Sequence, residues 1–184
     1  MRVLGIAGSL RSGSLNRALL HAAAELAPAG MEVRLFDGLG DIPPFNEDVE
    51  AQGDPARVRT FKAAIEEADA LLIATPEYNY GVPGVLKNAI DWASRPAGKS
   101  PLNRKPAAIM GASMGAHGTA RAQPALRQTF VFTETYVMLR PELYVARAHE
   151  KVDATGRLVD DATRRQLQKL LEAFALWIAR FGAS

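Results

Sequence analysis

The chain reads VLGIAGSLRSGSLNR over residues 3–17, and this stretch begins a pattern that the rest of the chain repeats. Residues 3–7 form a short apolar run, which predicts a buried strand. A loop of small residues follows, and residues 15–27, rich in Ala and Leu, predict a helix that ends at Pro28. A strand that enters a helix through a glycine-rich loop is the first half of a βαβ unit.

The same alternation continues to the end of the chain. Strands are predicted at 31–36, 70–75, 107–110 and 136–139, and helices at 55–68, 83–94, 119–131 and 160–181. Residues 41–54 and 140–159 are predicted to be irregular. About five strand–helix repeats predict an α/β protein, a three-layer sandwich with a parallel sheet, in one domain over residues 1–184.

In such a sheet the ligand crevice lies beyond the carboxyl ends of the strands. The loops to examine for function are therefore residues 8–16, 36–54, 76–83 and 111–118.

The composition excludes several kinds of chemistry. The chain has 184 residues, of which 48% are hydrophobic and 23% charged, as in ordinary globular proteins. It has no cysteine, which excludes disulfides, thiolate metal sites and cysteine nucleophiles. Any redox chemistry must therefore be carried by a bound group. With neither a targeting segment nor a long apolar run, we expect a cytoplasmic protein without a membrane partner.

Charge is distributed unevenly along the chain. Residues 1–92 hold 8 basic and 13 acidic residues, whereas residues 93–184 hold 14 basic and 7 acidic ones. The basic half contains no run of like charges, so we expect no nucleic-acid partner. It favours an anionic ligand or a contact between subunits, although an unevenly charged solvated surface explains it equally well.

The first loop, residues 8–17, has the composition of a phosphate cradle. Hydroxyl, guanidinium and amide groups come from Ser9, Arg11, Ser12, Ser14 and Asn16, and the helix N-terminus favours an anion. Neither a Walker motif nor a G-x-G-x-x-G fingerprint is present. A single phosphate with many hydroxyl donors suits a mononucleotide. The alternative is a plain turn in which Ser14 or Asn16 caps the helix.

The second loop, TPEYNYGVPG at residues 75–84, places two tyrosines and an asparagine at the expected crevice. Such groups suit a flat heteroaromatic ligand, and the alternative is a turn whose tyrosines cover the end of the sheet. In the following helix, Lys87 and Asp91 are predicted to form a surface ion pair. Trp92 is expected in the core or at a subunit interface.

The third loop, GASMGAHGT at residues 111–119, permits close backbone approach to a ring. Ser113 can donate a hydrogen bond there, and His117 is expected to be a surface or capping residue. The histidines have no metal-ligand spacing, and no hydrolase triad or nucleophile elbow is present. We therefore expect no metal site and no catalytic side chain.

Together these loops resemble the NAD(P)H-dependent FMN reductase family, of flavodoxin-like fold, and above all its branch of bacterial chromate and quinone reductases. Residues 8–16, GSLRSGSLN, are similar to the family's FMN-phosphate loop. Residues 76–92, PEYNYGVPGVLKNAIDW, are similar to its isoalloxazine loop and the following helix, and residues 113–115 fall at its third flavin loop. The resemblance implies a five-stranded parallel sheet of order 2-1-3-4-5.

The resemblance also implies a set of FMN contacts. The phosphate would be held at the first loop, and the flavin ring would be lined by the other two, largely through backbone atoms. The expected contacts are Ser9, Arg11, Ser14, Leu15, Asn16, Pro76, Glu77, Tyr78, Asn79, Tyr80, Ser113, Met114 and Gly115. A homodimer or homotetramer is implied as well, with Arg121 and Glu142 at two positions that link subunits in the branch. The third such position, a tyrosine in the branch, holds Pro124.

The implied activity is hydride transfer from NAD(P)H to FMN, followed by transfer of two electrons to an acceptor in a ping-pong cycle. The implied acceptors are small molecules: quinones, free flavins, azo dyes, ferric chelates or chromate. The alternatives are a flavodoxin-like electron carrier without its own NAD(P)H reductase activity, and a flavin-free binding module. Flavodoxins tend to be acidic, so the pI of about 9.0 favours the enzyme. The sequence does not distinguish NADH from NADPH, and Arg95, Arg104 and Arg121 are all candidates to meet a 2′-phosphate.

Overall fold

The computed structural model describes residues 1–181, so residues 182–184 of the predicted domain lie outside the described part. The strands are β1 (Arg2–Ala7), β2 (Glu32–Leu35), β3 (Ala70–Ala74), β4 (Pro106–Ala112), β5 (Tyr136–Val137) and β6 (Leu143–Val145). The helices are α1 (Leu15–Leu26), α2 (Glu47–Glu50), α3 (Ala56–Glu67), α4 (Gly84–Ala93), α5 (Ala122–Phe132) and α6 (Asp161–Ala179). Short 3-10 helices cover Leu39–Asp41 and Ala148–Glu150.

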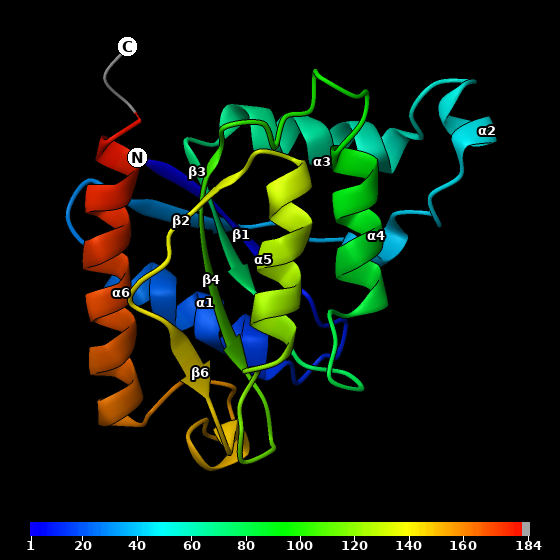
Figure 1. Cartoon of the computed structure of the whole chain (residues 1–184). Coiled ribbons are helices and arrows are strands. Elements are labelled where there is room, and N and C mark those ends of the chain that lie inside the picture. The colour runs from blue at the N-terminus through cyan, green and yellow to red at the C-terminus, as the bar shows by residue number, and fades with distance from the viewer. Residues whose placement is uncertain (182–184) are drawn as a thin grey trace.

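The strands form one parallel sheet of order β2-β1-β3-β4-β5, with β6 also paired to β4 (Figure 1). This is the predicted order, and the flavodoxin-like α/β/α class is confirmed. Every residue of β3 and β4 is buried, because helices cover both faces of the central strands. That double burial explains the continuous apolar runs of these two segments.

The far edge of the sheet differs from the prediction in two ways. The strand predicted at 136–139 is only two residues long, and the segment predicted to be irregular, 140–159, contains β6. β5 pairs with the start of β4 and β6 with its end, so the edge strand is divided into two pieces and the sheet has six strands. Pro141, which has no backbone N–H to donate to the ladder, lies in the interruption.

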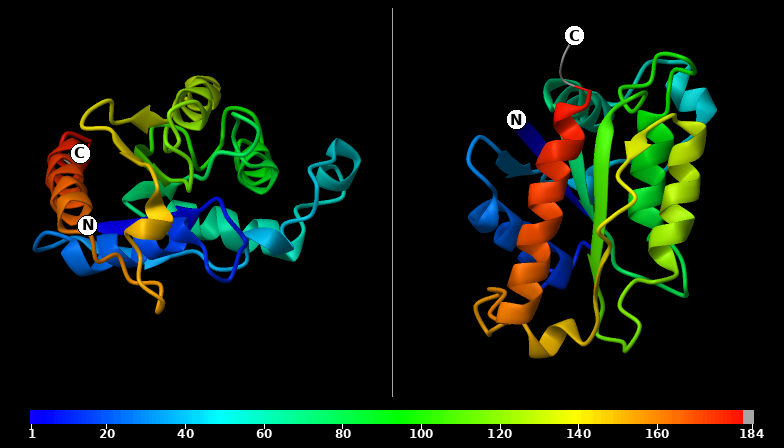
Figure 2. Two further views of the ribbon diagram at one scale, coloured as in Figure 1. Left: turned by 90° about the horizontal axis from the view of Figure 1, so that it is seen from below. Right: turned by 60° about the vertical axis from the view of Figure 1, so that its left-hand side comes forward.

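Two hydrophobic clusters, one on each face, hold the layers together. On one face α1 and α6 contribute buried side chains such as Leu19, Leu170 and Phe174. On the other face α3, α4 and α5 contribute residues such as Phe61, Trp92 and Phe130. Figures 1 and 2 show α6 across β4 from α4 and α5. Within residues 1–181, no helix combines the length and the apolar character needed to span a membrane.

The predicted roles of the α4 side chains agree with the structure. Trp92 is fully buried, as the core alternative predicted, and its indole N–H donates to the Pro43 carbonyl at 2.8 Å. Asn88 donates to the same carbonyl at 2.9 Å, so α4 anchors the loop after β2. Lys87 and Asp91 form the predicted ion pair, at 2.6 Å.

Asp160 caps α6, which packs on the same face of the sheet as α1. This cap provides a test of our account of the fold. Its carboxylate accepts the Thr163 hydroxyl at 2.6 Å and the Thr163 backbone N–H at 2.8 Å. These two bonds favour the charged form and hold the pKa of Asp160 below its ordinary value. The stability that the carboxylate contributes is therefore present above the ordinary pKa and is lost as the pH falls through the lowered one.

We predict that Asp160→Ala lowers the free energy of unfolding by about 1 kcal/mol at pH 7, the usual worth of an N-cap. The loss should shrink at pH 3, because the wild-type carboxyl group is then becoming protonated. Urea unfolding at the two pH values measures both numbers. An equal loss at both would contradict the role assigned to the charged cap.

Candidate functional site

The loops that follow β1, β3 and β4 meet at the carboxyl edge of the sheet, at the bottom of Figure 1. They enclose a cavity of about 190 Å³ lined by Ser9, Arg11, Ser14, Leu15, Asn16, Pro76, Glu77, Tyr78, Ala112, Ser113 and Met114. Ten of the thirteen residues expected to contact FMN are in this lining. Asn79, Tyr80 and Gly115 are not. Ala112 was missed by sequence reasoning, and its place at the end of the strand before the third loop is the signal that could have found it.

Asn16 joins the first loop to the third. Its side chain is almost fully buried. The amide nitrogen donates to the Ala112 carbonyl at 3.0 Å, and the amide oxygen accepts the Ala112 N–H at 2.9 Å. The Asn16 side chain therefore links the two loops, a structural role that could not be predicted from its position in the sequence. One N–H and one lone pair of the amide remain for a ligand.

The first loop has the donors that a phosphate needs. Ser14 caps α1, as the alternative interpretation predicted, because its hydroxyl oxygen accepts the Arg17 N–H at 3.2 Å. The Ser14 hydroxyl hydrogen remains able to donate. The N–H groups of Leu15 and Asn16 open the helix and have no acceptor within it. With the buried Ser9 hydroxyl and the exposed Arg11 at the same cavity, these donors fit an anionic group.

The second loop is held by its own acidic residue. One oxygen of the Glu77 carboxylate accepts the backbone N–H groups of Arg121 and Ala122, at 2.8 and 2.9 Å. Those groups open α5, whose N-cap residue, Arg121, supplies no capping side chain. The carboxylate is thus bonded to α5, and contact of this loop with a ligand through its backbone stays a prediction. Tyr78 stands at the cavity, half exposed, and donates a long hydrogen bond of 3.4 Å to the Ser9 hydroxyl.

The third loop depends on a close backbone approach at Gly111. A Cβ atom there would lie 2.3 Å from both the Thr75 carbonyl oxygen and the Thr119 hydroxyl oxygen, so only glycine fits. Beyond it, Ser113 donates its N–H to the Val145 carbonyl and accepts the Ala148 N–H, both at 3.0 Å. β6 and the residues after it therefore hold the third loop in place, while Met114 remains exposed.

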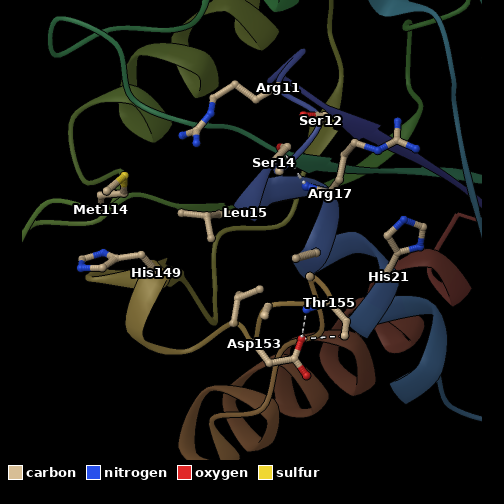
Figure 3. Close-up of a pocket in the computed structure, with 15 residues that line it drawn as sticks. Arg11, Ser12, Ser14, Leu15, Arg17, His21, Met114, His149, Asp153 and Thr155 are labelled. Carbon is tan, nitrogen blue, oxygen red and sulfur yellow. Dashed lines mark hydrogen bonds between the residues drawn. The ribbon is translucent and has the colours of Figure 1, made fainter.

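A second cleft, of about 530 Å³, adjoins the first and shares Arg11, Ser14, Leu15 and Met114 with it (Figure 3). Its other wall is the segment from His149 to Gly156, part of the region predicted to be irregular. Figure 3 shows Arg11, Met114 and His149 pointing to one side and Arg17 and His21 to the other. The basic side chains of this cleft thus do not converge on one point.

The structure separates the three arginines considered for a 2′-phosphate. Arg95 follows the end of α4, and Arg104 precedes the start of β4, so both lie toward the opposite edge of the sheet from the cavity. Arg95 is also paired with Glu50 at 3.0 Å. Only Arg121 stands beside the site loops. His117 is exposed in the third loop, as expected of a surface residue.

The two positions expected to link subunits have partners within the chain. Arg121 lies 3.6 Å from the Glu77 carboxylate. Glu142 lies 3.6 Å from Arg140 and accepts the Tyr144 hydroxyl at 2.7 Å. Burial, followed by this hydrogen bond to Glu142, raises the pKa of Tyr144 to about 12. Because these contacts are all within one chain, the roles of Arg121 and Glu142 at a subunit interface stay a prediction.

Comparison with known proteins gives a consistent result. The model of a family described as NADPH-dependent FMN reductase matches residues 1–150. An NAD(P)H-dependent FMN reductase of Pseudomonas aeruginosa is 54% identical over 98% of this chain and 96% of its own length. A quinone reductase of Escherichia coli is 43% identical over 98% of this chain and 96% of its own. Among solved structures, a flavoenzyme NAD(P)H:(acceptor) oxidoreductase of Paracoccus denitrificans is 40% identical, with a TM-score of 0.88 over 97% of both chains.

The Glu77 carboxylate gives a stability test. We predict that Glu77→Ala lowers the melting temperature of the FMN-free protein by about 3–10 °C, because two hydrogen bonds to a charged group at a helix start are lost. Glu77→Gln keeps an acceptor oxygen and should lose about half as much. The control is Glu32→Ala, which removes an exposed glutamate paired with Arg34 and should shift the melt by at most about 1 °C. If Glu77→Ala melts like this control, the cap is unimportant.

Proposed function

Because this chain belongs to the NADPH-dependent FMN reductase family, we propose that it binds FMN at the carboxyl edge of its sheet and uses NAD(P)H to reduce quinones. The observation that carries the proposal is the cavity in which ten of the expected contacts lie together. FMN, when bound, supplies the redox chemistry, since its ring can accept a hydride and return two electrons to an acceptor. The protein's own task is to bind and orient the reactants.

The first loop is the place for the phosphate. The hydroxyls of Ser9 and Ser14, the guanidinium of Arg11 and the free N–H groups that open α1 would all donate to it. The dipole of α1 adds a favourable field for the negative charge. Asn16 would act here mainly by holding the first and third loops at a fixed separation.

The second and third loops are the place for the flavin ring. Pro76 and Ala112 give the cavity apolar wall, and Tyr78 and Met114 stand exposed beside it. A mostly apolar slot with a few polar groups suits a flat heteroaromatic ring. The Glu77 carboxylate is bonded to α5, so this part of the lining has no acidic side chain free to act as an acid or base. This arrangement supports the expectation that no catalytic side chain is required.

A ping-pong cycle suits a site of this kind. With FMN in the cavity, a nicotinamide and an acceptor would have to occupy the exposed face of its ring in turn. Selection by shape is weak at such a face, so the proposed acceptors extend beyond quinones to free flavins, azo dyes, ferric chelates and chromate. We also propose the cytoplasmic location that the sequence analysis expects and, on the family resemblance, a homodimer or homotetramer.

The first test is steady-state kinetics with both nicotinamides and a panel of acceptors. We predict FMN-dependent oxidation of NADPH or NADH with benzoquinone, and parallel lines in double-reciprocal plots. Intersecting lines would contradict the ping-pong order. The electron-carrier alternative is separated by adding NAD(P)H alone without oxygen, which bleaches the bound flavin only if the protein is itself a reductase.

The second test concerns the phosphate loop. We predict that Arg11→Ala weakens FMN binding about 10- to 100-fold, the worth of one charge-assisted hydrogen bond. Titration of the FMN-free protein, followed by flavin fluorescence, measures the change. Arg34→Ala removes an exposed arginine of β2 and serves as the matched control, with less than a twofold effect expected. Equal affinities of the two variants would remove Arg11 from the phosphate site.

A further inference from the structure

The second loop contains a turn that its sequence does not favour. Residues Tyr78–Gly81 form a tight two-residue hairpin, in which the Gly81 N–H donates to the Tyr78 carbonyl at 2.9 Å and the Tyr78 N–H returns a bond at 3.2 Å. Asn79 has φ of 50° and Tyr80 has φ of 65°. Positive φ at both central residues defines a type I′ turn, which prefers Asn followed by Gly. Asn79 suits its position, whereas a tyrosine with positive φ is strained.

Within residues 1–181, the side chain of Tyr80 makes one cation–π contact, with Arg121. The residue is 70% exposed, and its ring lies under the guanidinium of Arg121, whose Cζ atom is 4.1 Å from the ring centroid. That distance is well within the range of a cation–π contact. The stacking with Arg121 therefore adds a side-chain contact to the two backbone hydrogen bonds that oppose relaxation of the strained turn.

Arg121 is itself fixed by the residue before the turn. Glu77 lies 3.6 Å from the Arg121 guanidinium and bonds the backbone N–H of the same residue at 2.8 Å. The Glu77 side chain is only 9% exposed, whereas that of Arg121 is 43% exposed. A chain of contacts thus runs from the second loop to α5 through Glu77 and returns to the loop through Arg121 and Tyr80.

We propose that Arg121 is a positioning residue, which stacks on Tyr80 to hold the strained Tyr78–Gly81 turn in the shape that binds the flavin ring. This inference rests on the proposed function for the ligand, but the turn and its contacts exist without it. A preformed loop binds more tightly than one that must be ordered on binding. In this role Arg121 raises FMN affinity without touching FMN, and the Tyr80 ring acts from outside the cavity lining.

A double-mutant cycle tests the proposal, because Tyr80→Gly gives the turn the Asn-Gly pair that it prefers and so removes its need for Arg121. We expect Arg121→Ala to weaken FMN binding about twofold to fivefold in the wild-type background, from the size of an exposed cation–π contact. In a protein that already carries Tyr80→Gly, the same substitution should leave binding unchanged within about 1.5-fold. Fluorescence titration with FMN measures all four proteins.

Two controls make the cycle decisive. Thermal melts of the four FMN-free proteins show that each is folded. Arg2→Ala removes another exposed arginine near a carboxylate, Asp69, at the opposite edge of the sheet, and should leave FMN affinity unchanged. If Arg121→Ala costs the same affinity in both backgrounds, Arg121 acts on the ligand directly and the proposal is wrong. The proposal is equally wrong if Arg121→Ala costs nothing in the wild-type background.

Hydrogen exchange separates this proposal from the proposed function. In the FMN-free protein, Arg121→Ala should speed exchange of the Gly81 amide about twofold to fivefold, since its bond to Tyr78 opens more often. The same substitution in the Tyr80→Gly background should leave the rate unchanged. A wild-type protein that fails to bind FMN would refute the proposed function alone, whereas an unchanged Gly81 rate in Arg121→Ala would refute the positioning role.

Discussion

The two hydrogen bonds between the buried Asn16 amide and the Ala112 backbone fix the geometry on which the candidate site depends. A parallel sheet brings the ends of its strands to one edge, but it does not determine how the loops beyond them are spaced. Asn16, in the first turn of α1, sets the distance between the first and third loops. Glu77 does the same between the second loop and α5. The hydrogen bonds of these two side chains thus hold the three loops in the positions that form the cavity.

If a bound cofactor carries the redox reaction and the protein only binds and orients it, the chain needs few reactive groups of its own. It has no cysteine, so electrons cannot pass through a thiol or a thiolate-held cluster. On the proposed function, its polar side chains at the cavity shape the loops or bind the phosphate. The protein would then contribute binding and orientation, which is the usual arrangement when a cofactor carries the reaction.

Much of this could be predicted from the sequence, because the signals are local. The buried runs of β3 and β4, the glycine-rich loop before α1 and the aromatic loop after β3 each follow from a few adjacent residues. Long-range contacts could not be predicted in this way. The split at Pro141, the capping of α5 by Glu77 and the pairing of Asn16 with Ala112 depend on residues that meet only in the folded chain. For the same reason Arg95 and Arg104 were candidates in the sequence, although they lie toward the opposite edge in the structure.

The central claim is that the loop from Ser9 to Asn16 binds the phosphate of FMN, and a comparison of FMN with riboflavin tests it most directly. The two ligands share the ring and the ribityl chain and differ only in the phosphate. Two or more charge-assisted hydrogen bonds at the first loop predict that riboflavin binds at least about a hundredfold more weakly than FMN in calorimetric titration. Affinities that agree within about twofold would contradict the account, because the first loop would then contribute nothing to the site.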